Sequence, residues 1–315
     1  MKLGIVGLPN VGKSTLFNAL TSTQNAQAAN YPFCTIEPNV GVVEVPDHRI
    51  YDLAAMFKPK KTTPAFTRFV DIAGLVAGAS KGEGLGNQFL SHIRETDAIA
   101  HVVRCFEDGN ITHVEGSIDP VRDMDIINTE LCLADLESVD KKKTKTAKLA
   151  QAGIKQAKVD LPVLEKVYDA LQNGTPARAL TLSEDDLEVL KELNLITLKP
   201  VLYVLNMAED DIADPLANKF VQAASAEAEK EGAKWVPISA EIEEEVSELD
   251  GEEAKAFLED LGEEEPGLNR LIRTAYSMLG LINFFTVGPD ECRSWTVRAG
   301  TKAPKAAGKI HSDFE

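Results

Sequence analysis

Short apolar runs recur along the chain, and most of them end at glycine-rich or polar residues. Runs of this length, rich in Val, Ile and Leu, predict buried strands, and the stretches between several of them show helical spacing. Strands that alternate with helices are typical of a mostly parallel sheet covered by helices. We therefore predict an α/β fold with helices from residue 16 and over 216–232. The predicted strands are residues 3–6, 41–45, 66–70, 98–104, 200–205 and 235–238.

A different pattern begins at Pro120, where apolar residues recur at helical spacing over a long stretch. The repeat continues to Val139, the polar run 141–145 (Lys-Lys-Lys-Thr-Lys) follows, and a second helical stretch covers 161–171. Two long amphipathic helices joined by a basic tip predict an antiparallel hairpin, inserted at residues 126–198. The lysines of the tip either contact RNA or form an ordinary solvated face, and the sequence leaves both open.

Charge and composition limit the class of protein. The 315 residues are enough for two or three domains, and 33 Lys and Arg against 50 Asp and Glu give a net charge of −17. This charge excludes a protein that coats nucleic acid by bulk attraction, so any RNA contact must be local. No run approaches the roughly 20 apolar residues of a membrane span. The four cysteines form no close pair and the five histidines lie away from them, which predicts neither disulfides nor zinc. We expect a cytoplasmic monomer.

The strongest chemical signal lies between the first strand and the first helix, where residues 7–15 read Gly-Leu-Pro-Asn-Val-Gly-Lys-Ser-Thr. Glycines let backbone amides approach a polyphosphate, and the helix N-terminus adds partial positive charge. Lys13 would neutralise the β and γ phosphates, and the Ser14 hydroxyl would be a ligand of Mg²⁺. A glycine-rich turn with an ordinary helix cap is the alternative. The predicted nucleotide contacts are Asn10, Val11, Gly12, Lys13, Ser14 and Thr15.

Two further segments are predicted to sense the γ-phosphate. The irregular segment 30–39 holds Thr35, which would add a second hydroxyl to Mg²⁺ or is only a turn residue. Asp71, at the end of a strand, would hold the Mg²⁺ hydration shell, and the backbone amide of Gly74 would turn toward the γ-phosphate. Glycines continue through residues 74–90, which predicts a segment without regular structure that reorders with the nucleotide. A plain flexible linker is the alternative there.

The ends of the last two strands stand where nucleotide-binding switch proteins read the base. Guanine-specific proteins have Asn-Lys-x-Asp at the first, whereas this chain has Asn-Met-Ala-Glu, in which the longer Glu209 should weaken the bidentate contact with guanine. The acidic stretch 241–265 predicts a solvated helical surface without site chemistry. The candidate base-site residues are Asn206, Met207, Glu209, Ser239 and Ala240.

Together, residues 7–15 with Pro9 and Asn10, the segment 30–39 and the glycine-rich segment after Asp71 resemble the Obg group of P-loop proteins. They are most similar to its YchF subfamily, the Obg-like ATPases. The resemblance spans essentially the whole chain and implies a helical insertion and a preference for ATP over GTP. Residues 281–315 resemble the opening of a TGS domain, a small β-grasp module often tied to RNA or regulation.

These features predict a Mg²⁺-dependent nucleoside triphosphatase whose hydrolysis resets a conformational switch, acting with the ribosome or RNA. Intrinsic hydrolysis should be slow, because Leu75 follows Gly74 where Ras-like enzymes place a water-orienting glutamine. The backbone, a partner or His113 would orient the water instead, although an ordinary loop histidine is equally consistent. Asn10 makes K⁺ a candidate second cation, or is a turn-forming asparagine.

Two other functions remain open, namely a nucleotide-gated ribosome or RNA adaptor in which hydrolysis is incidental, and a switch that uses GTP. The predicted domains are a nucleotide-binding domain of residues 1–125 and 199–280, the hairpin insertion 126–198, and a truncated TGS-like segment, 281–315. That last segment is too short to form a core of its own and should depend on the preceding domain.

Overall fold

The computed structural model describes residues 1–25, 39–72, 85–109, 113 and 116–315. Nearly all of the predicted irregular segment 30–39, with Thr35, lies outside these residues. Gly74 and Leu75 in the glycine-rich segment also lie outside them. The roles assigned to these three residues therefore stay predictions.

A six-stranded sheet forms the centre of the molecule, in the order β2-β4-β1-β5-β6-β7. β2 (Val40–Glu44) is antiparallel to β4 (Phe66–Asp71), and all other neighbours are parallel. Every residue of β5 and β6 is buried, as expected for central parallel strands covered on both faces. The predicted α/β fold with a mostly parallel sheet is confirmed. The remaining strands are β1 (Lys2–Val6), β5 (Ala98–Arg104), β6 (Val201–Asn206) and β7 (Lys234–Ile238).

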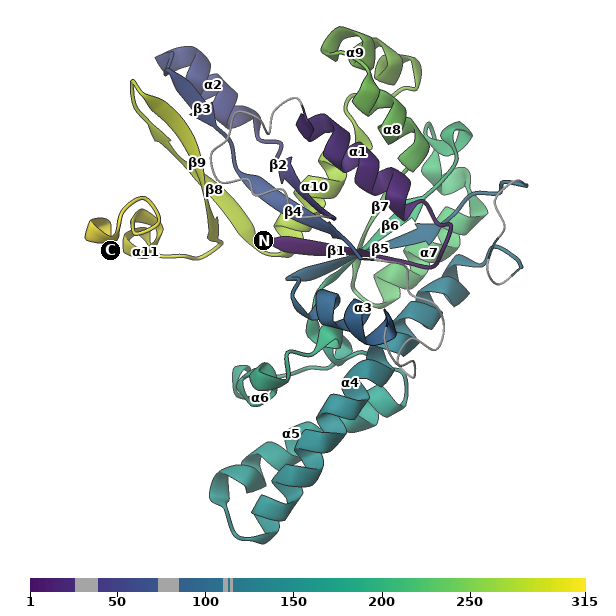
Figure 1. Cartoon of the computed structure of the whole chain (residues 1–315), viewed down its shortest axis with the longest axis vertical. Helices are drawn as coiled ribbons and strands as arrows, with labels where there is room; N and C mark the ends of the chain where they lie inside the picture. Colours follow the sequence, from purple (N-terminus) through teal and green to yellow (C-terminus); the bar gives the residue numbers. More distant parts are fainter. Residues whose placement is uncertain (26–38, 73–84, 110–112, 114–115) are drawn as a thin grey trace.

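Helices cover both faces of this sheet (Figure 1). On one face lie α1 (Lys13–Asn25), α8 (Ala240–Glu248) and α10 (Gly267–Met278). The other face carries α3 (Leu85–Arg94), α4 (Pro120–Gln151) and α7 (Lys219–Lys230). α7 begins at Lys219 rather than at residue 216, because the Asn218 side chain caps it by accepting hydrogen bonds from two backbone amides. Two further helices, α2 (His48–Phe57) and α9 (Gly251–Asp260), complete this part of the chain.

One prediction for the glycine-rich segment is wrong. The sequence predicts irregular structure through residue 90, but α3 (Leu85–Arg94) is a helix. Phe89, Leu90 and Ile93 of α3 are buried in the main hydrophobic core. This burial outweighs the roughly 1 kcal/mol that a glycine costs inside a helix.

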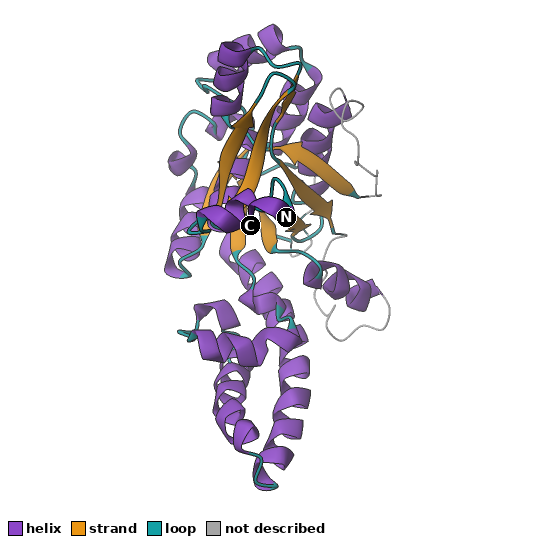
Figure 2. Ribbon diagram, turned by 90° about the vertical axis from the view of Figure 1, so that its left-hand side faces the viewer, coloured by secondary structure: helices purple, strands orange, loops and turns teal. Residues whose placement is uncertain are grey.

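The helical hairpin projects from the α/β body, as Figures 1 and 2 show. It consists of α4 (Pro120–Gln151) and α5 (Lys155–Gln172). The polar run 141–145 lies inside α4, so the predicted position of the tip is wrong. Lysine is a good helix former, and the helix continues until a turn at 152–154, where Gly153 adopts a φ of +89°.

The hairpin has a small hydrophobic core of its own, separate from the main core. Val139 of α4 packs there with Leu164, Val167 and Leu171 of α5. The chain then returns to β6 through α6 (Glu184–Leu190). It also passes 3-10 turns at Ala177–Ala179, Lys191–Leu193 and Ile196–Leu198.

The last part of the chain forms a second, three-stranded sheet. β8 (Leu281–Val287) pairs with β9 (Glu291–Arg298), and β3 (Lys61–Thr63) from the first half of the chain adds to β9 in parallel. Cys292 of β9 is fully buried, with its thiol 3.9 Å from the carbonyl oxygen of Ile50 in α2. The segment is thus packed on the α/β body, and α11 (Ala303–Ala307) and a 3-10 turn at Ser312–Phe314 follow its strands. In the described part of the chain, every helix is too short or too polar to cross a membrane.

Candidate nucleotide-binding site

The phosphate loop connects β1 to α1 and needs glycine at two positions. Gly7 has a φ of +154° and Gly12 a φ of +95°, which L residues rarely adopt. A Cβ at Gly12 would lie 2.2 Å from Nδ2 of Asn206, and one at Gly7 would lie 2.5 Å from the Val102 carbonyl oxygen. Asn10, the predicted potassium ligand, also lies in the left-handed region with a φ of +61°. The loop therefore presses its backbone against β5 and β6.

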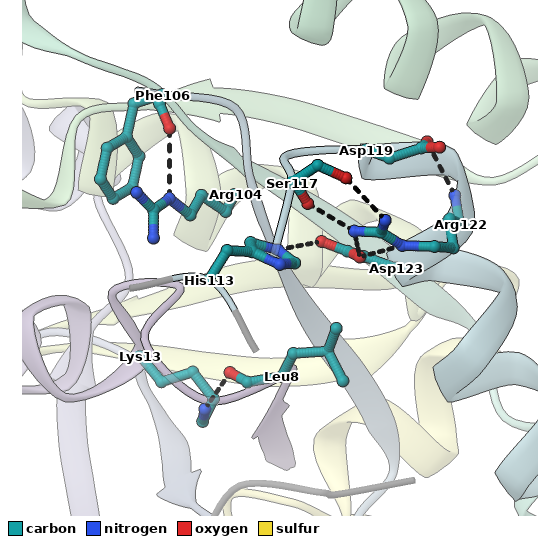
Figure 3. A network of polar contacts seen from close by, with 9 residues as sticks. All are labelled: Leu8, Lys13, Arg104, Phe106, His113, Ser117, Asp119, Arg122 and Asp123. Carbon is teal, nitrogen blue, oxygen red and sulfur yellow. Dashed lines mark hydrogen bonds and ion pairs between the residues drawn. The ribbon is translucent and has the colours of Figure 1, made fainter. Parts of the chain in front are cut away.

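Lys13 is held inside this loop. Its side chain is buried, and its Nζ donates a hydrogen bond of 2.6 Å to the carbonyl oxygen of Leu8, as Figure 3 shows. Burial lowers the pKa of Lys13 to about 8, against the opposing effect of the Asp71 carboxylate. Burial likewise raises the pKa of Asp71, and Lys13 opposes that shift. The loop thus keeps a desolvated ammonium group where it can exchange one backbone carbonyl for phosphate oxygens.

The predicted magnesium ligands fit the chemistry of that ion. Ser14 is exposed in the first turn of α1, and Asp71 is half-buried at the carboxyl end of β4, next to β1. Both offer oxygen, the donor that Mg²⁺ prefers. Among the described residues there is no group of three or more acidic, histidine or cysteine side chains that could enclose a metal. This donor set suits an ion that keeps waters and shares phosphate oxygens with the protein.

Asn206 connects the phosphate loop to the start of α8. Its Nδ2 donates to the carbonyl oxygen of Val11, and its Oδ1 accepts from the backbone amide of Ala240, both at 2.9 Å. Ser239, the residue before α8, is buried beside them. The structure thus brings together Val11, Gly12, Asn206 and Ala240, four of the predicted nucleotide contacts, and their role in binding stays a prediction. Each side-chain atom of Asn206 keeps one hydrogen or one lone pair for a further partner.

The other two base-site candidates lie in different surroundings. Met207 is only 3% exposed and belongs to the main core, and its amide donates to the Ile238 carbonyl oxygen at 2.9 Å. This burial leaves Met207 little surface to offer a base. Glu209 is exposed in the 3-10 turn Glu209–Asp211.

His113 forms a buried pair with Asp123 in the first turn of α4. Nε2 of His113 lies 2.8 Å from Oδ2 of Asp123, and both side chains are almost fully buried. Arg122 holds the other carboxylate oxygen through Nη2 at 3.0 Å and donates to the Ser117 carbonyl oxygen. Figure 3 shows these groups meeting at the start of α4, which Asp119 caps. The loop of His113 follows β5, so it leaves the same edge of the sheet as the phosphate loop.

Two buried charged residues beside the proposed site, Asp123 and Arg104, were not predicted from the sequence. An aspartate in the first turn of a helix that begins Asp119-Pro120 is usual for a helix start, so nothing marked Asp123 as the partner of His113. Arg104 ends β5 and is almost fully buried, with Nε donating to the Phe106 carbonyl oxygen and its guanidinium 4.5 Å from the Phe106 ring centre. The one sequence feature that could have pointed to Arg104 is its position as a charged residue at the end of an apolar strand.

The acidic stretch 241–265 contains one exception to the predicted solvated surface. Glu243 in α8 is 5% exposed, and its carboxylate accepts hydrogen bonds from the amides of Gly267 at 2.7 Å and Leu268 at 3.1 Å. Burial raises the pKa of Glu243 to about 7, although these bonds oppose the shift. The stretch is therefore not solvated throughout, since this carboxylate caps α10.

Comparisons with known proteins show the family of the chain. A family described as 50S ribosome-binding GTPase matches residues 2–131, and the C-terminal family of YchF GTPases, described as a protein of unknown function, matches 281–315. The "Ribosome-binding ATPase YchF" of Bacillus subtilis is 54% identical over 99% of this chain and 85% of its own length. The protein of that name from Escherichia coli O157:H7 is 53% identical over 100% of this chain and 85% of its own.

A solved structure, that of the Schizosaccharomyces pombe YchF GTPase, superposes with a TM-score of 0.89 at 44% identity. The match covers 100% of this chain and 85% of the fission yeast chain. Because similarity at this level covers both the phosphate loop and the helical hairpin, the chain belongs to the YchF family of P-loop nucleotide-binding proteins.

Proposed function

We propose that this protein is a slow, Mg²⁺-dependent ATPase that binds GTP less well and whose nucleotide state governs its association with the ribosome. The observation that carries the proposal is the buried Lys13, with its Nζ on the Leu8 carbonyl oxygen inside the phosphate loop. Burying the ammonium group of Lys13 inside this loop costs free energy, and an anion that replaces the Leu8 carbonyl oxygen would offset that cost. The names of the relatives support ATP as the nucleotide and the ribosome as the partner.

In this mechanism the phosphate loop binds the phosphates of the nucleotide, and residues at the strand ends orient the loop and the metal ion. Backbone amides of the loop and Lys13 take the β and γ phosphates, while Ser14, together with Thr35, would hold Mg²⁺ and Asp71 would hold its water shell. When bound, Mg²⁺ neutralises charge on the transferred phosphoryl group. Asn206 keeps the loop in register with α8 through Val11 and Ala240.

His113 is the proposed group that orients the attacking water. Asp123 holds its Nε2 and fixes the ring, so Asp123 acts as a positioning residue. Leu75 is apolar and cannot hold a water, which is why intrinsic turnover should be slow. The backbone of Gly74 would contribute an amide at the γ-phosphate.

The proposed loss of guanine selectivity rests on Asn206-Met207-Ala208-Glu209. An aspartate that accepts two guanine hydrogens is absent, and the exposed Glu209 is one methylene longer. Losing a good bidentate contact is worth about 1–3 kcal/mol, which would erase a roughly ten- to hundredfold preference for guanine. A positive preference for adenine comes from the family resemblance.

Potassium is proposed as a second cation through Asn10. An amide oxygen in the phosphate loop would hold the ion near the phosphates, where it would stabilise charge in the transition state. Turnover in K⁺ should then exceed turnover in Na⁺ at equal ionic strength. Equal rates would leave Asn10 as a turn-forming residue.

One set of measurements tests the proposal as a whole. Affinities for ATP and GTP and single-turnover rates should be measured with and without bacterial ribosomes. We expect tighter binding of ATP, slow hydrolysis alone and faster hydrolysis with ribosomes. GTP binding tenfold tighter than ATP would make the protein a GTP switch. Ribosome affinity that follows the bound nucleotide, with no change in turnover, would favour an adaptor in which hydrolysis is incidental.

A further inference from the structure

The free end of the hairpin carries an unusual concentration of positive charge. Residues 141–159 contain seven lysines and no aspartate or glutamate, although the chain as a whole has a net charge of −17. Figures 1 and 2 show this end projecting away from the α/β body. A polyanion repelled by the rest of the surface could therefore approach this end.

Four of the seven lysines form no direct ion pair with a described carboxylate, although Glu192 lies close enough to attract Lys145. Lys141, Lys142 and Lys143 form ion pairs with Glu137, Glu192 and Asp140. The other four are exposed, and no described carboxylate lies within ion-pair distance of their ammonium groups. We name these four the lysine tip: Lys145, Lys148, Lys155 and Lys158.

Two of the four charges of the lysine tip do not serve helix stability, whereas Lys148 lies in the last turn of α4, where the helix dipole favours a cation. Lys155 and Lys158 lie in the first turn of α5, where the helix dipole favours carboxylates. That turn holds no acidic residue, and its N-cap Ile154 makes no side-chain capping hydrogen bond. A sequence optimised for folding would place Asp or Ser here. The cations at this helix start therefore point to a ligand rather than to the hairpin itself.

Exposed apolar side chains accompany the lysine tip. Leu149, Ile154 and Val159 are 43%, 49% and 64% exposed around the same turn. Each is the direct sequence neighbour of a lysine of the tip. The end of the hairpin thus offers cations with apolar contact area between them, as a docking surface does.

We propose that the lysine tip docks on the phosphate backbone of folded RNA; this inference rests on the proposed association with the ribosome and assigns it a surface. Residues 141–159 contain no arginine, the residue that reads base edges by bidentate contacts. Lysines are point charges on flexible stems and suit phosphates, whose contacts position a protein without reading sequence. The double-stranded parts of folded RNA are recognised mostly in this way, through shape and backbone.

The test compares two variants with the same net charge. The tip variant carries Lys145→Gln, Lys148→Gln, Lys155→Gln and Lys158→Gln, and glutamine preserves helix propensity. The control variant replaces four exposed lysines dispersed over the α/β body by glutamine: Lys219, Lys230, Lys234 and Lys255. Circular dichroism should show unchanged helix content in both.

Two probes are used at several salt concentrations, namely intact bacterial ribosomes and ribosomal RNA freed of protein. We expect the tip variant to bind both at least tenfold more weakly, with the slope of log affinity against log salt reduced by about 2–4. The control should keep the wild-type affinity and slope. Equal binding of both variants to RNA would overturn the inference while leaving the proposed function standing.

A photo-crosslinker at Val159 identifies the partner class. Crosslinks to RNA are expected, whereas crosslinks only to ribosomal protein would overturn the inference in favour of an acidic protein partner. Failure of the wild type to bind ribosomes would contradict the proposed function separately. In that case, binding of protein-free RNA that depends on the lysine tip would still support the inference. Lack of such binding would overturn the inference.

Discussion

The side-chain amide of Asn206 donates a hydrogen bond of 2.9 Å to the carbonyl oxygen of Val11, 195 residues away in sequence. Its oxygen accepts from Ala240 at the same distance, so one side chain connects the phosphate loop, β6 and α8. The strand end that is predicted to read the base thus also shapes the proposed phosphate loop. A substitution there should affect nucleotides without regard to their base.

Asn206→Ala is expected to weaken ATP and GTP binding by similar factors, about ten- to hundredfold each. The change removes two buried hydrogen bonds and leaves the Ala240 amide unsatisfied, at a cost of about 1–3 kcal/mol. Asn206→Asp should be worse, because it turns an acceptor toward the Val11 carbonyl. Isothermal titration with both nucleotides measures this, with Asn173→Ala at the exposed end of α5 as control. Loss of ATP binding alone would show that Asn206 acts through the base.

His113→Ala is expected to lower single-turnover hydrolysis by about a hundredfold while leaving ATP affinity within threefold. General base or water-positioning residues contribute on the order of 10²–10⁴ in rate. Asp123→Asn should lower the rate in the same direction but less, since it weakens the 2.8 Å contact that holds the ring. His92→Ala, at an exposed position of α3, is the matched control. An unchanged rate in His113→Ala would contradict the assignment.

Lys13 should take up a proton when nucleotide binds at alkaline pH. Its pKa of about 8 reflects burial, and phosphates must raise it because they favour the charged form. Binding is therefore strongest below about pH 8 and should fall about tenfold by pH 9. Calorimetry in buffers with different ionisation heats measures the proton uptake. Lys13→Arg stays charged and should show none, even if it binds more weakly.

The fold and the phosphate loop could be predicted because they depend on local patterns. Apolar runs followed by Gly7–Thr15 leave few alternatives, and the structure places the strands close to the predicted ranges. The position of the hairpin turn could not be predicted in this way. Lysine is helix-forming, so 141–145 looks polar in sequence whether it ends a helix or continues one.

Long-range contacts account for the other differences. Glu243 belongs to a run of glutamates, and only the packing of α10 on α8 separates it from its exposed neighbours. The pairing of His113 with Asp123 joins a loop to a helix start, and no periodicity encodes it. β3 is only three residues long and is defined by its partner β9.

Ile50→Ala is expected to expose the C-terminal segment to proteolysis. Ile50 is 1% exposed in α2, and its carbonyl oxygen lies against the buried Cys292 of β9. A cavity there should cost about 2–5 kcal/mol of packing between α2 and the second sheet. Limited chymotrypsin digestion should then cut shortly after residue 280, at Leu281, Phe284 or Phe285, while sparing the α/β body. Tyr51→Ala, at the exposed neighbour, is the control, and equal resistance of both variants would contradict this role for Ile50.

Glu243 should make the stability of the protein fall as the pH rises toward neutrality. Its folded pKa is about 7, above the usual 4.5, because burial outweighs the two backbone hydrogen bonds that its carboxylate accepts. The folded state therefore favours the protonated acid. The resulting stabilisation is fully present below about pH 4.5 and is lost as the pH passes through about 7. The free energy at stake is about 3 kcal/mol at most.

Glu243→Gln removes this titration but keeps an oxygen that can accept from the Gly267 amide. Because the free energy of unfolding of this variant will differ from wild type at every pH, the quantity to compare is the slope of that free energy against pH. Urea unfolding at pH 5, 6, 7 and 8 should show the free energy of unfolding falling faster in wild type than in Glu243→Gln. Glu241→Gln changes an exposed glutamate of the same helix and should keep the wild-type slope. Parallel curves for wild type and Glu243→Gln would mean that Glu243 is ionised in the folded protein throughout this range.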